Sequence, residues 1–380
     1  MNFKIRLEDI YRYLLTAILW KVTFIAQLSW IAGARVVANQ VSSLCTRLIL
    51  FLVVIYIIFK SVKKPSLYDL ATVAVLICAY LSYRVVDDDT FMYAAILVML
   101  AKPFDIERTL KLYFKNMVLI IVSILIVLCL GLTNNKMVDF TYAVGYSLGT
   151  GHPNVIAALL LNTTLLGIAL YLKNSPERSI VLSIIVAVVI YVITASRTSS
   201  ILLLVFSIVY LLYLIMKKTK TQWIMNALKL TMVGVVAFSI YMMVNGGRAF
   251  GVNDTNFYVR FLQASRILKT YGIHLWGSNI TFVSITEAAQ TGVTPVILDN
   301  GYLRLLLYYG LVALVIFVVG IMTLIRKIGK QKDYILLLIV ALFLAGGLME
   351  KTVYSIQLNF TLILITTSIE DAFDGWLARN

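Results

Sequence analysis

The chain has 380 residues, of which 61% are hydrophobic and only 13% are charged. About a quarter of the residues of a typical soluble domain are charged. This composition therefore excludes a soluble globular protein. The formal net charge of +15 calls for an explanation, and the topology of a membrane protein supplies one below without nucleic-acid binding.

Apolar segments recur along the whole chain and approach the roughly 20 residues that a helix needs to cross the hydrocarbon core. None shows the two-residue alternation of membrane barrel strands. We therefore predict an all-α integral membrane protein, a single polytopic domain over residues 1–380. The expected spans lie near residues 14–32, 44–60, 68–86, 90–102, 114–133, 153–172, 179–195, 199–216, 223–244, 299–325, 334–350 and 355–370. The fourth of these twelve is short and the tenth is long.

Basic clusters between the spans predict the orientation, because Lys and Arg gather in cytoplasmic loops. The clusters fall on alternate sides of successive hairpins and can all be cytoplasmic in one topology, together with both termini. The acidic turn Val86–Thr90 then lies outside, as does the long segment Asn245–Leu298. The main clusters are Lys60, Lys63 and Lys64; Lys102, Arg108, Lys111 and Lys115; Lys217, Lys218 and Lys220; and Arg326, Lys327, Lys330 and Lys332.

Two polar motifs on the expected outer face stand next to spans. Gly149–Asn154 precedes the sixth span, where Pro153 suits a helix start and His152 can serve as a hydrogen-bond donor or a base. Thr194–Ser200 places Arg197 among hydroxyls between the seventh and eighth spans. Arg197 can clamp an anion with its planar fork or simply reach the lipid headgroups, and both readings stay open.

The long outer loop, residues 245–298, contains an amphipathic stretch over Thr255–Tyr271 that predicts a helix along the membrane surface. Arg260, Arg266 and Lys269 contribute to its polar side. Arg260 and Arg266 are six residues apart, hence about 120° apart around a helix, and need not serve one site. Contact with lipid phosphates remains the alternative role for Arg266 and Lys269.

Carboxylates follow at two later positions. Asp299 or Asn300 can cap the helix that begins the tenth span, and Asp299 can instead act as a general base at the mouth of a cavity. Glu350 and Lys351 form an ionisable pair near the expected outer end of the eleventh span, which is either a functional feature or a local ion pair. With two His and three scattered Cys, we expect no metal site and no cofactor.

Several arginines and candidate bases thus gather on one face of the membrane, which suits a membrane-borne substrate that carries phosphate. In their order along the chain these motifs resemble those of the Wzy-type polysaccharide polymerases and the related O-antigen ligases, over residues 145–370. The residues that carry the resemblance are the Gly149–Asn154 entry, Ser196–Thr198, Arg260 ahead of Leu275-Trp276-Gly277, Asp299–Gly310, and Glu350.

This resemblance implies a GT-C-like membrane glycosyltransferase in a bacterial cell membrane, active at its outer face. Such an enzyme polymerises oligosaccharide repeat units carried on undecaprenyl diphosphate, with inversion at the anomeric carbon and without a metal ion. It implies diphosphate binding by Arg197 and Arg260, with Arg266 as a further candidate. It also implies a flippase and a chain-length regulator of the same pathway as partners.

The identity of the base stays open among Asp299, His152 and Glu350, and a strong base is not required for an oxocarbenium-like centre. The ligases typically carry a His where this chain has Asp299, which favours a polymerase over a ligase. A lipid-linked sugar flippase or secondary transporter is the remaining alternative. Against it, carriers place their polar sites near the midplane and often show two related halves, whereas this chain shows no internal repeat and places 54 residues in one outer loop.

Overall fold

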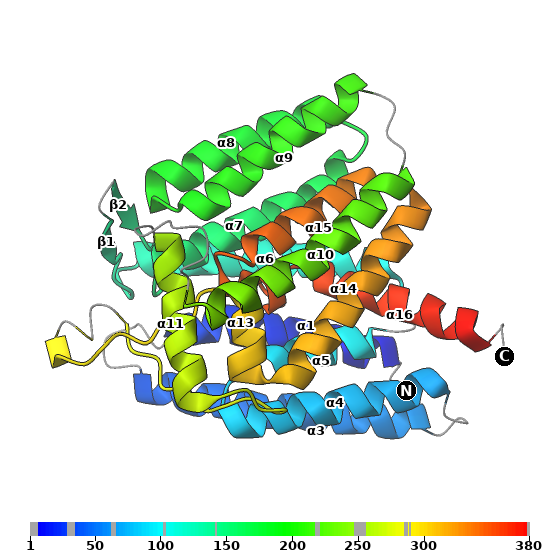
Figure 1. The fold of residues 1–380 in the computed structure, drawn as a ribbon, viewed down its shortest axis with the longest axis horizontal. Helices are drawn as coiled ribbons and strands as arrows, with labels where there is room; N and C mark the ends of the chain where they lie inside the picture. Colours follow the sequence, from blue (N-terminus) through cyan, green and yellow to red (C-terminus); the bar gives the residue numbers. More distant parts are fainter. Residues whose placement is uncertain are drawn as a thin grey trace. The chain divides into compact units, whose positions relative to one another are not determined.

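The computed structural model describes residues 7–28, 35–61, 66–101, 104–140, 143–216, 221–246, 256–284, 288 and 290–377. It consists mostly of helices (Figure 1). Its elements fall into two compact units that interleave along the sequence. Unit 1 comprises Met1–Leu70, Ile96–Lys218 and Ile356–Glu370, and unit 2 comprises Ala71–Ala95, Thr219–Ser355 and Asp371–Asn380. The prediction of a single polytopic domain stays a prediction.

Unit 1 holds most of the long helices. Its helices and strands are α1 (Leu7–Leu19), the π-helical turn η1 (Trp20–Ile25), α2 (Ala26–Leu28), α3 (Arg35–Ser61), α6 (Ile106–Cys129), β1 (Met137–Phe140), β2 (Ala143–Tyr146), α7 (Pro153–Gly167), η2 (Ile168–Leu172), α8 (Pro176–Thr194), α9 (Arg197–Met216) and most of α16 (Thr361–Leu377). The helices α8 and α9 lie side by side over their whole lengths (Figure 1), joined by a hydrogen bond between the Ser183 and Ser207 hydroxyls.

Unit 2 contains the long loop and the helices around it. Its elements are α10 (Thr221–Val244), α11 (Asn256–Tyr271), α13 (Gly301–Arg304), η4 (Leu305–Tyr309), α14 (Leu311–Gln331), α15 (Tyr334–Gly346) and the 3-10 turn η5 (Lys351–Tyr354). Two further helices, α4 (Leu67–Val86) and α5 (Thr90–Leu100), contribute residues to both units. The expected amphipathic helix at 255–271 is confirmed as α11.

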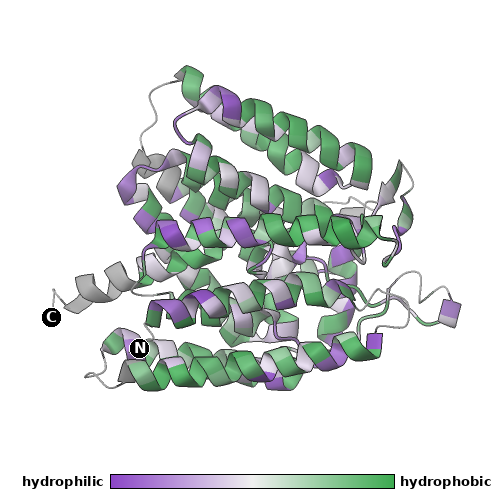
Figure 2. Cartoon of the chain, turned by 180° about the vertical axis from the view of Figure 1, so that it is seen from behind, coloured by the Kyte–Doolittle hydropathy of each residue, from purple (hydrophilic) through white to green (hydrophobic). Residues whose placement is uncertain are grey.

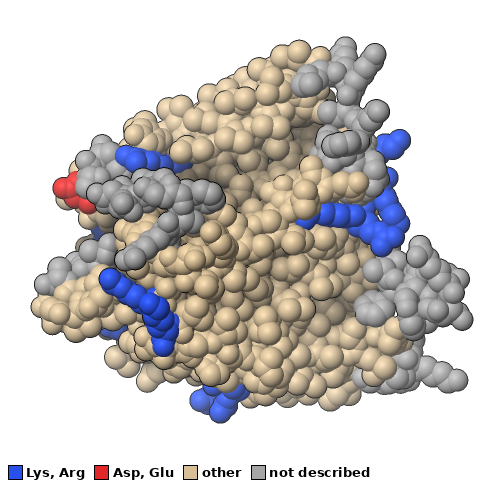
Figure 3. Space-filling view, viewed as in Figure 1, with Lys and Arg blue, Asp and Glu red and all other residues tan. Residues whose placement is uncertain are grey.

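Among the residues that the structure describes, eight helices are long and apolar enough to cross a membrane, and each overlaps one of the twelve expected spans. The other four expected spans, at 14–32, 90–102, 334–350 and 355–370, coincide with shorter or more polar helices, so twelve crossings remain a prediction. Most helices are hydrophobic along their middles (Figure 2), and few charged side chains interrupt the face drawn in Figure 3. Phe51, Val192 and Leu230 are among the large apolar side chains left exposed, as lipid contact requires.

Some predicted features lie outside the described residues. They are the end of the first span, 29–32, the parts 247–255, 285–287 and 289 of the long loop, and the basic residues Lys63, Lys64, Lys102, Lys217, Lys218 and Lys220.

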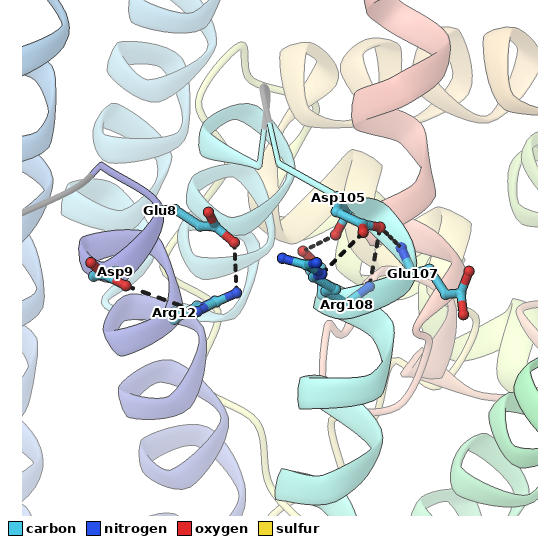
Figure 4. Close-up of polar contacts among 7 residues, drawn as sticks. Glu8, Asp9, Arg12, Asp105, Glu107 and Arg108 are labelled. Carbon is cyan, nitrogen blue, oxygen red and sulfur yellow. Dashed lines mark hydrogen bonds and ion pairs between the residues drawn. The ribbon is translucent and has the colours of Figure 1, made fainter.

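The neighbouring helices α1 and α6 begin at the same end of unit 1, as Figure 4 shows. Each begins with a short-range ion pair within its own first turns, Glu8 with Arg12 at 2.6 Å and Asp105 with Arg108 at 3.3 Å. Asp105 also caps α6 by accepting hydrogen bonds from the backbone N–H groups of residues 107 and 108. The predicted topology makes both helices cross in the same direction, and their parallel packing agrees with it.

The 11-residue helix α5 is buried along its length and is too short to span the roughly 30 Å hydrocarbon core at 1.5 Å per residue. The carbonyls of a helix's last turn run out of partners within the helix. Here four side-chain hydroxyls from four other helices donate to them. The bonds run from Tyr11 to Leu97, from Thr366 to Val98, from Tyr68 to Met99 and from Tyr56 to Leu100.

A second break in helical structure separates α15 from α16, where only the 3-10 turn η5 intervenes between Gly346 and Thr361. In the part of this segment that belongs to unit 1, side chains replace the missing helical bonds. The Asn162 amide donates to the Gln357 carbonyl and accepts from the Phe360 N–H, and the Tyr113 hydroxyl donates to the Ile356 carbonyl. Non-helical backbone at membrane depth is tolerated where it is satisfied in this way.

Two features differ from the sequence prediction. The tenth expected span, 299–325, is not one continuous helix, because Gly310 adopts a φ of +102° and separates η4 from α14. The chain also forms a small antiparallel hairpin of β1 and β2, with Met137 opposite Tyr146, which we did not predict. Its strands have four residues each, too few for an alternating pattern to stand out.

The hydroxyl bonds at the end of α5 are open to a direct test. Tyr11→Phe keeps the buried ring, which stacks on Phe104 at 5.1 Å, but removes the donor to Leu97. We expect a loss of about 1–2 kcal/mol in the free energy of unfolding in detergent, the cost of a buried hydrogen bond. Tyr13→Phe on the same helix is the control, because Tyr13 is exposed, and an equal loss in both variants would contradict this account.

Candidate functional site

In unit 2 the long loop is fastened to the start of α14 through backbone contacts. We call residues 274–278 the strap. The N–H groups of Leu311 and Val312, which the first turn of a helix leaves free, donate to the carbonyls of His274 and Leu275 at 3.0 and 3.3 Å. In return the Ser278 N–H donates to the Tyr308 carbonyl at 3.1 Å. The strap therefore takes the place of a helix cap.

This contact depends on two glycines with positive φ. A Cβ on Gly277 would lie 1.9 Å from the Tyr308 carbonyl oxygen, and one on Gly310 would lie 2.3 Å from the Leu275 carbonyl oxygen. Their φ angles are +91° and +102°. Only glycine fits at both points. The contact brings together two motifs that the sequence analysis treated separately, the turn at 275–277 and the segment Asp299–Gly310.

Asn300 is the N-cap of α13, and its side chain is fully used. Its Oδ1 accepts from the N–H groups of Tyr302 and Leu303, while its amide donates to the Ser239 hydroxyl and the Leu348 carbonyl. The sequence left open whether Asp299 or Asn300 caps this helix, and Asn300 does. Asp299 is thereby left for another role, and 41% of its side chain is exposed.

Arg260 of α11 faces Asp299. Its Nε lies 3.8 Å from the Asp299 Oδ2, longer than the 2.7–2.9 Å of a charge-assisted hydrogen bond. The other end of the guanidinium donates to the backbone carbonyl of Met349, next to Glu350. Three of the residues singled out from the sequence, Arg260, Asp299 and Glu350, thus lie in one region of unit 2.

Arg304, at the end of α13, lies beside them. Its guanidinium carbon is 4.3 Å from the centre of the Phe282 ring and 4.9 Å from that of Tyr308. Its Nη2 lies 4.0 Å from the Asp88 Oδ2, in the turn between α4 and α5. Only 12% of the Arg304 side chain is exposed. A buried guanidinium held by aromatic rings and a distant carboxylate is a well-oriented positive charge.

Lys351 completes this group. It interacts electrostatically with Arg304, Asp88, Asp299 and Glu350. Desolvation by the surrounding protein, and next the charge of Arg304, lower the pKa of Lys351, although its side chain is exposed at the surface. We call Asp88, Arg260, Asp299, Arg304, Glu350 and Lys351 the charged cluster of unit 2.

His152 and Arg197 belong to unit 1, where both lie near the hairpin. His152 caps α7, its Nδ1 accepting from the Asn154 N–H at 3.2 Å, and its ring packs edge-on against Phe140 of β1. Gly145 of β2 packs so closely on the Thr194 carbonyl that a Cβ would lie 2.3 Å from it. Thr194 ends α8, and the exposed Arg197 begins α9. The hairpin therefore contacts both polar motifs of unit 1, Gly149–Asn154 and Thr194–Ser200.

Arg266 lies on α11 but has an exposed side chain, whereas Arg260 is largely buried. The six-residue spacing separates their directions as the sequence analysis expected. Among the described residues no three His, Cys, Asp or Glu side chains gather as a metal site would need. That the chemistry proceeds without a metal stays a prediction.

The sequence pointed to no binding or catalytic role for Asp88 or Arg304, and to Lys351 only as the partner of Glu350. All three stand in motifs noted above, namely the acidic turn Val86–Thr90, the segment 298–304 and the pair Glu350-Lys351. The sequence did show that charged residues at three points in the chain lie next to the expected outer ends of spans. It does not show which of these span ends contact one another in the folded protein.

Comparison of the chain with models of protein families, with curated proteins and with solved structures finds no match.

The glycine contact of the strap predicts a specific loss of stability. In Gly277→Ala the new methyl group would clash with backbone atoms at a residue with positive φ. In Gly292→Ala the residue also has a positive φ (+70°), but no atom of the described residues lies near the new methyl group. We expect Gly277→Ala to lower the free energy of unfolding in mixed micelles by about 1–3 kcal/mol more than Gly292→Ala, the usual cost of overpacking. Equal losses of unfolding free energy in the two variants would show that the close contact between Gly277 and the Tyr308 backbone does not contribute to stability.

The lowered pKa of Lys351 predicts a pH-dependent stability. Above the lowered pKa the folded protein loses this proton while the unfolded chain still holds it, so the wild-type stability rises with pH until about 10.5, the ordinary value. Lys351→Met removes this charge at every pH. We expect the melting temperature of the variant, relative to wild type, to be highest at low pH and to fall as pH rises through this window. A difference that does not change with pH would contradict the assignment.

Proposed function

We propose that the protein is a membrane glycosyltransferase that polymerises oligosaccharide repeat units carried on undecaprenyl diphosphate, at the outer face of a bacterial cell membrane and without a metal ion. The observation that carries the proposal is the arrangement of Arg260 and Asp299. A guanidinium anchored on one side by the Met349 carbonyl lies 3.8 Å from a half-exposed carboxylate, without a close hydrogen bond between them. The resemblance to the Wzy-type polymerases supplies the substrate class.

The two side chains suit the two needs of the reaction. The C1–O bond to the lipid diphosphate breaks, and the leaving diphosphate gains negative charge that a fixed cation stabilises in a partly dry site. Meanwhile the hydroxyl oxygen of the incoming unit forms the new bond to C1, and its proton passes to a base. Arg260 takes the first role and Asp299 the second, with Glu350 as the other carboxylate of the cluster.

His152 and Arg197 in unit 1, and Arg266 on the exposed side of α11, stay predictions from the resemblance. The same holds for the expected partners, a flippase and a chain-length regulator.

One observation favours the second candidate function, a lipid-linked sugar flippase or secondary transporter. Transporters often bind their substrate where membrane helices are broken, and the chain between α15 and α16 is broken over Gly347–Phe360. In the part of this segment that lies in unit 1, however, the backbone groups of residues 356, 357 and 360 are already satisfied by Tyr113 and Asn162. This arrangement leaves less of that backbone for a substrate than a transport site would need.

The test is polymerisation by the purified full chain in detergent, with authentic lipid-linked repeat units and EDTA present. We expect a ladder of products that drops at least about 100-fold in rate in Arg260→Gln, the typical effect of removing one transition-state donor. Asp299→Asn is expected to lower the rate without lowering affinity for the lipid diphosphate. Lys269→Gln, at an exposed residue of the same helix, is the matched control, and thermal unfolding separates loss of activity from loss of fold.

No ladder from authentic substrate, together with movement of the substrate across liposomes that contain the protein, would overturn the proposal in favour of the transporter. Unchanged activity in Arg260→Gln would leave a polymerase but remove this site from it.

A further inference from the structure

Arg304 has a side chain whose position is fixed from several sides. It follows directly from the α13 helix that Asn300 caps, and its guanidinium lies against two rings whose centres are 5.0 Å apart, Phe282 and Tyr308. Tyr308 is itself held by its hydroxyl, which donates to the Val86 carbonyl at 3.2 Å. Phe282 precedes the bridge between Val283 and Val296 in the long loop. The guanidinium is thus oriented before any ligand arrives.

The hydrogen-bonding capacity of this guanidinium is hardly used within the described chain. It has five N–H donors. Nη1 reaches the Leu298 carbonyl at 3.5 Å, the outer limit for a hydrogen bond, and buried Nε has no partner among the described residues. Burial of a charge is costly unless it is paired and hydrogen-bonded. Cation–π contacts with two rings offset part of this cost but leave the N–H groups unsatisfied.

Asp88 does not satisfy the remaining N–H donors of Arg304. Its Oδ1 accepts from the Thr90 N–H at 3.0 Å at the start of α5, so that the carboxylate is fixed in the turn. Its Oδ2 stays 4.0 Å from the Arg304 Nη2. The carboxylate therefore attracts Arg304 without occupying its N–H groups, and a stronger acceptor can take them.

Arg260 and Arg304 both reach the same short piece of chain. Arg260 faces the carboxylate of Asp299, and Arg304 faces the carbonyl of the preceding residue, Leu298. Consecutive Cα atoms are only 3.8 Å apart. A ligand with two adjacent anionic groups is the kind that can engage two arginines placed in this way. Lys351, which interacts electrostatically with Arg304 and Asp299, adds a third positive charge.

We infer that Arg304 is a second anion-binding residue of this site, engaging one phosphate of a lipid diphosphate while Arg260 engages the other, and that Asp88 holds Arg304 in position when the site is empty. This inference rests on the proposed function, because the ligand it names is the donor of that reaction. It assigns a binding role to Arg304 and a positioning role to Asp88.

The experiment measures affinity of the purified full chain in detergent for undecaprenyl diphosphate without sugars. Arg304→Gln is expected to weaken binding at least tenfold, and Arg304→Lys to weaken it less. Lys269→Gln, at an exposed basic residue of the same unit, is expected to leave affinity unchanged. Equal affinity in Arg304→Gln and Lys269→Gln would overturn the inference.

Asp88→Asn gives a readout that a purely structural role would not produce. The asparagine oxygen can still accept from Thr90, but the negative charge that competes with the ligand is gone, so affinity is expected to rise severalfold. If Arg304→Gln fails to fold, as a melting curve would show, Asp88→Asn decides alone. Unchanged or weaker affinity in folded Asp88→Asn would overturn the inference.

Two further arms separate this inference from its alternatives. Phosphatidylglycerol in excess should not displace the diphosphate, and displacement would identify a lipid headgroup as the anion and overturn the assignment. If wild type neither binds undecaprenyl diphosphate nor forms a ladder, the proposed function fails and the inference fails with it. If wild type does both while Arg304→Gln binds normally, only the inference fails.

Discussion

The architecture depends on one constraint, the need to satisfy every backbone N–H and C=O group in surroundings that offer no water. A continuous helix meets this need by itself, whereas each break in a helix must be repaired by side chains. At the end of α5 four hydroxyls donate to four successive carbonyls. After α15 the amide of Asn300 and the guanidinium of Arg260 donate to the carbonyls of Leu348 and Met349. Polar residues that the sequence suggests as functional candidates therefore often have a structural role as well, because they satisfy backbone groups at helix breaks.

Arg260 combines such a structural role with a candidate anion-binding role. Its bond to the Met349 carbonyl fixes the guanidinium, and the unsatisfied part of the group faces Asp299 at a distance too long for a good hydrogen bond. Arg304 is fixed differently, by rings instead of a carbonyl, and faces a carboxylate at a similar distance. In both cases the guanidinium group is held rigidly, but the facing carboxylate is too distant to neutralise its charge fully. A site of that kind is preorganised for an anion, because the cost of orienting the charge is met during folding.

The sequence predicted the parts that depend on local pattern. The long apolar runs predicted the eight long helices, the amphipathic stretch predicted α11, and Pro153 marked the start of α7 correctly. It predicted less well where tertiary contacts decide. Gly310 interrupts an apolar run because the strap needs backbone space there, and α5 is stable at 11 residues because hydroxyls from elsewhere satisfy its last turn. The pairing of Asp88 with Arg304 joins residues 216 positions apart, which no local pattern encodes.

The strap has a consequence for how such a loop can diversify. Gly277 is fixed on Gly310, Val283 is bridged to Val296, and Asn300 is fixed by its cap and by Leu348, so both ends of the loop are closed by backbone contacts. The entropic cost of a closed loop grows only slowly with its length. Insertions or exchanges between Val283 and Val296 can thus change what this part of the loop exposes while Arg260, Asp299 and Arg304 stay where they are. The surface of the loop and the geometry of the charged cluster can in this sense evolve separately.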